Sequence, residues 1–73
     1  MNIVAVLSQV PQVQWHEPIQ TSMYTLYRGV YKNVQFYCYT LDGQDHLGKV
    51  GRDAYLGEKV VSNPIKDLEA LVR

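Results

Sequence analysis

The fold is decided by residues 23–41, which read MYTLYRGVYKNVQFYCYTL. This stretch carries five of the six tyrosines, interleaved with valine, leucine and phenylalanine. Aromatic and β-branched side chains at this density favour strands over a helix. Because Lys32-Asn33 is the only turn-like pair inside the stretch, we predict a β-hairpin in which residues 24–31 pair with residues 34–41.

A two-residue turn also determines which side chains share a face of the hairpin, because residues opposite each other point to the same side. The predicted core face carries the pairs Tyr31–Val34, Gly29–Phe36 and Tyr27–Cys38. The opposite face carries the pairs Arg28–Tyr37, Leu26–Tyr39 and Tyr24–Leu41. This second face mixes aromatic and polar groups, so it suits either a covering layer or a partner.

Beyond the hairpin, residues 43–61 contain four of the five glycines. We expect a glycine-rich loop there with two short strands, at 47–50 and 54–61, the latter with Tyr55, Val60 and Val61 pointing inward. A helix over 64–72 follows, with Asn63 as N-cap and Pro64 at the first helical position. Apolar residues fall on one side of this helix, which is too short to be stable alone and must dock on the sheet.

The N-terminal part is apolar and extended in pattern. Ile3-Val4-Ala5-Val6-Leu7 is predicted to be a short strand covered on both sides, or alternatively a segment that adds to a partner's sheet. Residues 10–18 are bracketed by Pro11 and Pro18, which exclude a central strand, so they form an edge strand or an extended arm.

These elements predict an α+β fold in one small domain, residues 1–73. The sheet is expected to have three or four mostly antiparallel strands, with one C-terminal helix packed on it. The segments are 1–18 as arm or edge strand, 23–41 as hairpin, 43–61 as loop with short strands, and 64–72 as helix.

Composition excludes several classes of function. Seven Lys and Arg balance seven Asp and Glu, whereas domains that bind nucleic acid usually carry a basic excess. One cysteine rules out an intramolecular disulfide framework. The pattern contains no secretory signal and no apolar run long enough to span a membrane, so we expect a cytoplasmic protein.

Catalytic motifs are equally weak. Residues 43–49 resemble part of a phosphate-binding loop, but Val50 stands where the magnesium-binding hydroxyl is required. Asp42, Asp45 and His46 are ordinary turn chemistry, and Cys38 is expected to be a buried, inert thiol. We therefore expect no enzyme activity, no cofactor and no metal site.

The remaining features of the sequence point to binding surfaces rather than to catalytic motifs. Aromatic residues and arginine are enriched in protein interfaces, and the first charged residue of the chain is Glu17. The candidate partner contacts are Val4, Leu7, Trp15, Tyr24, Arg28 and Tyr37. Trp15 is the strongest candidate among these, although its side chain could instead fill a gap at the edge of the core.

Two other functions stay open at this point. Arg28 and the tyrosines could stack the bases of a single-stranded nucleic acid, although net charge zero makes direct nucleic-acid binding unfavourable. Alternatively, the chain could be a structural subunit that forms a homo-oligomer through residues 10–15. A monomer that binds a larger protein complex is the expected state.

The whole chain resembles the small phage-encoded regulators that bind bacterial RNA polymerase. The features in common are the short length, the uncharged start at residues 1–16, the tyrosine-rich stretch and the short final helix. The resemblance implies docking on a large polymerase subunit in the host cytoplasm, with displacement of the sigma factor. It further implies inhibition of promoter-dependent initiation and a role in antitermination, while assigning no role to individual residues.

Overall fold

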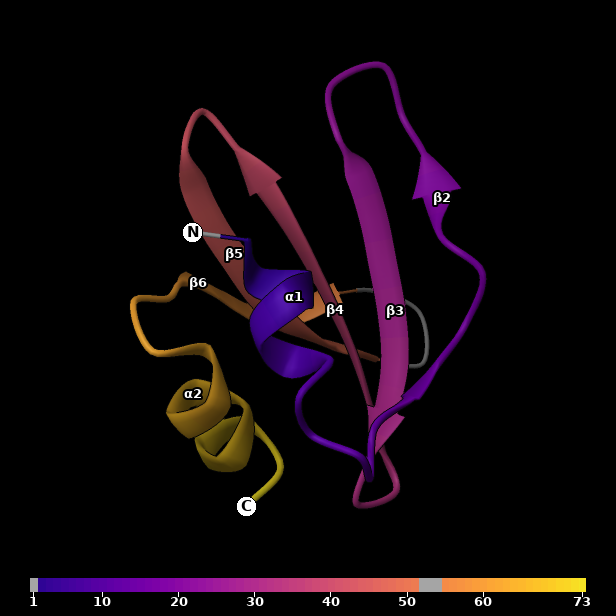
Figure 1. Ribbon diagram of the computed structural model, residues 1–73, viewed down its shortest axis with the longest axis vertical. Coiled ribbons are helices and arrows are strands. Elements are labelled where there is room, and N and C mark those ends of the chain that lie inside the picture. Colours follow the sequence, from indigo (N-terminus) through magenta and orange to yellow (C-terminus); the bar gives the residue numbers. More distant parts are fainter. Residues whose placement is uncertain (1, 52–54) are drawn as a thin grey trace.

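The computed structural model describes residues 2–51 and 55–73, without the side chains of Tyr55 and Leu56. Within these described residues, two helices and six strands form an α+β domain (Figure 1). In chain order they are α1 (Ile3–Leu7), β1 (Gln14–Trp15), β2 (Ile19–Gln20), β3 (Thr25–Tyr31), β4 (Val34–Leu41), β5 (Gln44–Val50), β6 (Tyr55–Val60) and α2 (Pro64–Leu71).

The strands form one antiparallel sheet in the order β1-β3-β4-β5-β6, with β2 also pairing with β3. The predicted class and the C-terminal helix are confirmed, but the prediction of three or four strands is too low. Two of the additional strands, β1 and β2, have two residues each and lie along the same edge of β3. Pairs this short leave no periodic pattern in a sequence.

The β3–β4 hairpin has the predicted register, with Tyr31 opposite Val34 and Tyr27 opposite Cys38. Its turn residues Lys32 and Asn33 both have positive φ, at 51° and 66°. Two consecutive left-handed residues define the tight turn whose twist matches that of paired strands. The hairpin prediction is therefore confirmed, and the positive φ angles of Lys32 and Asn33 explain its tight turn.

A second turn of the same kind connects β4 to β5. Asp42 and Gly43 have φ of 52° and 75°, and β5 runs from Gln44 to Val50. The prediction of a glycine-rich loop with a short strand at 47–50 was thus wrong in extent, because Asp-Gly opens a hairpin at this point.

The main core lies between the first face of the sheet and the two helices, which both pack on that face. Phe36, Cys38 and Leu47 are fully buried on the strands. They meet fully buried residues of the helices, namely Ile3, Leu7 and Leu68. The face predicted to be the core side is therefore the core side.

The predicted N-terminal strand is instead the helix α1. Asn2 caps it, because the side-chain Oδ1 accepts hydrogen bonds from Val4 N at 3.0 Å and Ala5 N at 3.3 Å. Ser8 Oγ donates to Val4 O at 2.6 Å at the other end. Five residues are too few for propensity to decide, so packing on β4 and the Asn2 cap override the β-branched composition.

On the second face of the sheet, Leu26, Tyr37 and Tyr39 form a smaller core cluster. The sheet coils there, since Tyr37 and Tyr39 of β4 both donate hydrogen bonds to Glu58 of β6, a strand two places away. Gly48 on β5 lies opposite Tyr37, and a Cβ at Gly48 would come within 2.6 Å of that ring. The missing side chain lets the Tyr37 ring lie across β5 toward β6, which crosses behind the sheet in Figure 1.

β1 confirms an edge strand within residues 10–18, and α2 has Asn63 as N-cap and Pro64 in its first turn, as predicted. Val61 is buried as predicted, but Val60 is 54% exposed, so its inward assignment was wrong. The orientation predicted for Tyr55 lies outside the described side chains. None of the helices in the described part of the chain has the length and apolarity needed to cross a membrane.

Candidate functional site

Charge is distributed very unevenly along the chain. Apart from Glu17, every Asp, Glu, Lys and Arg lies at or after Arg28. The elements built from the uncharged part are α1, β1, β2 and the start of β3. Figure 1 shows α1 in front of the sheet, with β3 and β2 to its right.

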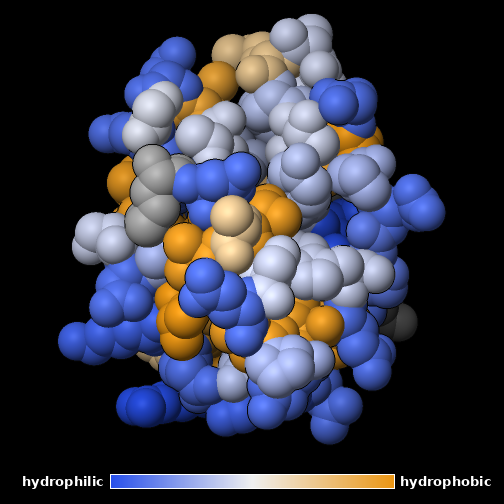
Figure 2. Space-filling model, viewed as in Figure 1, coloured by the Kyte–Doolittle hydropathy of each residue, from blue (hydrophilic) through white to orange (hydrophobic). Residues whose placement is uncertain are grey.

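The outer side of α1 is apolar. The helix reads IVAVL, with Ile3 and Leu7 buried in the core, Ala5 exposed, and Val4 and Val6 half-buried. Figure 2 shows apolar atoms gathered where α1 lies, with hydrophilic side chains around them. A helix that is apolar on all sides is normally covered on all sides, so this outward face lacks the covering that its composition calls for.

β2 and the turn that connects it to β3 present two more exposed apolar side chains. Met23 is 67% exposed and Ile19 is 41% exposed. Thr21 holds the turn in shape, because its Oγ1 donates to Tyr24 O and accepts from the backbone N–H groups of Met23 and Tyr24. Met23 therefore projects from an ordered turn.

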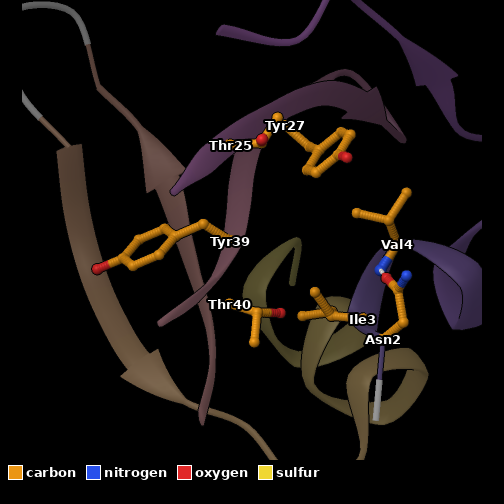
Figure 3. Close-up of a pocket in the computed structure, with 7 residues that line it drawn as sticks. All are labelled: Asn2, Ile3, Val4, Thr25, Tyr27, Tyr39 and Thr40. Carbon is orange, nitrogen blue, oxygen red and sulfur yellow. Dashed lines mark hydrogen bonds between the residues drawn. The ribbon is translucent and has the colours of Figure 1, made fainter. Parts of the chain in front are cut away.

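A cavity of about 380 Å³ borders the outer side of α1 and reaches Thr25, the first residue of β3 after the turn. It opens between α1, which contributes Ile3 and Val4, and the strands β3 and β4, which contribute Tyr27 and Thr40 (Figure 3). Its lining contains no Asp, Glu, Lys, Arg or His. We call the outer side of α1 (Val4, Ala5, Val6), this cavity and Met23 of the β2–β3 turn the uncharged surface. Ile19 pairs with Leu26, so it shares the second face of the sheet with Tyr24 and is not part of this surface.

A different chemistry occupies the second face of the sheet. Glu58 accepts hydrogen bonds from Tyr37 at 2.7 Å and Tyr39 at 2.9 Å, and His46 Nδ1 lies 3.4 Å from its Oε2. The hydrogen bond from Tyr37, then that from Tyr39 and the nearby His46, lower the pKa of Glu58. Burial, followed by Glu58, raises the pKa of Tyr39 to about 12.

This arrangement does not favour a stacking platform for bases. Tyr37 and Tyr39 are buried, and the carboxylate of Glu58 holds both of their hydroxyl groups. A negative charge at the centre of the face also repels phosphate. We therefore interpret the Glu58 cluster as a tie between β4 and β6.

The lowered pKa of Glu58 predicts a dependence of stability on pH. The Glu58 carboxylate contributes stability above its ordinary pKa of 4.5, and this contribution is lost as pH falls through the lower folded-state value. In urea unfolding from pH 7 to pH 3, Glu58→Gln should be less stable than the wild type at pH 7, and the difference should shrink at acidic pH. A difference that stays constant would contradict the role of the ionised carboxylate; Glu69, whose pKa is also lowered, remains in both proteins.

The structure separates the six predicted contact residues. Val4 lies on the uncharged surface, and Tyr24 stacks on Tyr39 with ring centroids 4.1 Å apart. Leu7 and Tyr37 are 0% and 3% exposed, so a partner cannot reach their side chains and their assignment as contacts is corrected.

The other two predicted contacts lie on or near the edge strand. Trp15 is half-buried and meets Phe36 edge-on, with centroids 5.6 Å apart, which is the geometry of a plug at the core edge. Arg28 on β3 is half-buried, and its backbone carbonyl accepts from His16 N next to β1.

Nucleophilic and metal chemistry find no support among the described residues. Cys38 is fully buried, and burial, then Asp45, raises its pKa to about 12, so it is a neutral thiol at pH 7. Asp45 accepts from Thr40 on the first face, whereas His46 stacks on Tyr39 on the second face. Within residues 2–51 and 55–73, no three His, Cys, Asp or Glu side chains gather as metal ligands would.

The exposed residues Ala5, Ile19 and Met23 were not among the predicted contacts. The only signal for them in the sequence is the absence of charge, which does not show which side chains are exposed. Comparison of the chain with protein-family models, with curated proteins and with solved structures gives no match.

Proposed function

We propose that this protein is a non-enzymatic regulator that docks on a larger protein complex through the uncharged surface. The observation that carries the proposal is the outer side of α1, where Val4, Ala5 and Val6 form an apolar patch on the outside of the molecule. A partner that covers this side would remove the patch from water, which is the main favourable term in protein association.

The composition of the uncharged surface supports a protein partner. The centres of protein interfaces are depleted in charged residues and enriched in tyrosine and methionine. Tyr27 and Met23 belong to the surface. The ordered turn at Thr21 supports the proposal further, because a backbone segment that is already held in one conformation loses little entropy on binding.

The proposed complex is bacterial RNA polymerase, on the strength of the whole-chain resemblance to small phage regulators. In this proposal the protein occupies a surface that the sigma factor or the promoter complex requires. Occlusion by surface contact needs no catalytic residue.

The test uses the full-length protein and purified bacterial RNA polymerase core enzyme. We expect co-elution in gel filtration, competition with sigma factor, a loss of promoter-dependent transcript, and read-through at a terminator. If the core enzyme does not bind, affinity capture from a nuclease-treated lysate decides the next step. A stoichiometric complex with another assembly would overturn the polymerase proposal, whereas salt-sensitive binding to oligonucleotides alone would overturn docking on a protein.

A further inference from the structure

The cavity between α1 and β3 has the size of a site for one large side chain. It measures about 380 Å³, whereas a closed apolar cavity of about 150 Å³ already holds benzene. Ile3 and Val4 form one wall, and Figure 3 shows Tyr27 and Thr40 facing the same space while the Tyr39 ring points away from it. Space for an aromatic ring is thus present without any movement of the strands.

The polar groups of the lining are neutral, and the hydroxyl protons of its two threonines are already used. Thr40 Oγ1 donates to Asp45 at 2.6 Å, and Thr25 Oγ1 donates to Gln20 at 2.8 Å. A threonine hydroxyl that donates its one proton still has lone pairs that accept. The cavity therefore offers an apolar wall together with hydroxyl acceptors, and no ion pair to a charged ligand.

We propose that this cavity is a socket for one neutral aromatic side chain of the partner, and that tyrosine fits it best. The ring would lie against Val4 and Tyr27, and the phenol O–H would donate to the hydroxyl oxygen of Thr25 or Thr40. This inference rests on the proposed function, since the cavity is continuous with the apolar side of α1 through Val4. Anchors of this type commonly carry much of the binding energy of an interface.

The test needs only the isolated protein. We would titrate ¹⁵N-labelled protein with N-acetyl-tyrosinamide, N-acetyl-phenylalaninamide and N-acetyl-glutamate and follow the backbone amide shifts. We expect saturable, millimolar binding of the two aromatic amides, with shifts at Val4, Thr25 and Tyr27, because a ligand with few atoms binds weakly. Tyrosinamide should bind about threefold or more tightly than phenylalaninamide, the effect of one neutral hydrogen bond.

Two matched variants identify the acceptor. Thr25→Val removes the hydroxyl at nearly constant shape and should lower the preference for tyrosinamide, whereas Thr25→Ser should keep it. A preference that is unchanged in Thr25→Val assigns the acceptor to Thr40.

Other results would overturn the socket. They are the absence of saturable shifts, shifts at other residues, or equal binding of N-acetyl-glutamate. Because this titration contains no partner, its failure would overturn the socket alone and leave the docking proposal to its own test. Conversely, if the titration succeeds but the protein binds no protein complex, the cavity remains a site for aromatic ligands and the docking proposal is wrong.

Discussion

Ala5→Glu is expected to weaken binding to the partner by about 2 kcal/mol or more, which is about a 30-fold rise in Kd. Ala5 is exposed on the outer side of α1, so a glutamate there has room in the free protein. In the complex the same carboxylate would lie in a desolvated interface without a partner, which costs free energy. Met23→Glu should have the same effect at the β2–β3 turn. Isothermal titration of the partner measures both.

Val60→Glu is the matched control for these two variants. Val60 is also an exposed apolar residue, at 54%, but it lies on β6 and outside the uncharged surface. It should bind as tightly as the wild type, and all three variants should unfold at nearly the wild-type temperature. Equal loss of binding in Val60→Glu, or full binding in Ala5→Glu, would place the interface elsewhere.

Trp15→Ala is expected to lower the free energy of unfolding by about 2–4 kcal/mol. The ring is half-buried against the core and meets Phe36 edge-on, so its removal opens a gap at the β1 edge. A domain of this size has only about 5–10 kcal/mol of stability, so the loss is a large fraction of it. Urea unfolding followed by circular dichroism measures the change.

Trp15→Phe is the control for that variant. It keeps an aromatic ring against Phe36 and should lose clearly less stability than Trp15→Ala. If Trp15→Ala unfolds like the wild type but binds the partner poorly, the plug interpretation is wrong and Trp15 is a contact residue.

The elements that could be predicted from the sequence are those with a local signal. The register of the β3–β4 hairpin follows from a two-residue turn. Side chains alternate between the two faces along a strand, so once the turn is known every side chain of the hairpin has an assigned face. The start of α2 follows from Asn63-Pro64, since an N-cap and a proline in the first turn act within a few residues.

The elements that could not be predicted depend on contacts across the fold. Five apolar residues at 3–7 fit a strand or a helix equally well, and the choice is made by packing against β4 and α2. Likewise, Tyr37 was assigned to a face that suited either a covering layer or a partner, because nothing local indicates that β6 returns to place Glu58 over it.

The uncharged surface also combines a feature that is visible in the sequence with features that depend on the fold. The lack of charge before Glu17 was visible in the sequence and drew attention to Val4 and Leu7 together. A strand covered on both sides would bury both side chains, whereas the helix buries Leu7 and leaves Val4 half-buried on the surface. The exposure of Met23 depends on the turn at Thr21, which has no distinctive sequence pattern.

The proposed function requires that the partner covers the uncharged surface. Amide hydrogen exchange, measured on the free protein and on its complex with the partner, tests this claim most directly. We expect slower exchange in the complex at Ala5–Ser8 and at Met23–Thr25, with no change at Lys59 and Val60. Protection confined to β6, with α1 exchanging as in the free protein, would contradict it.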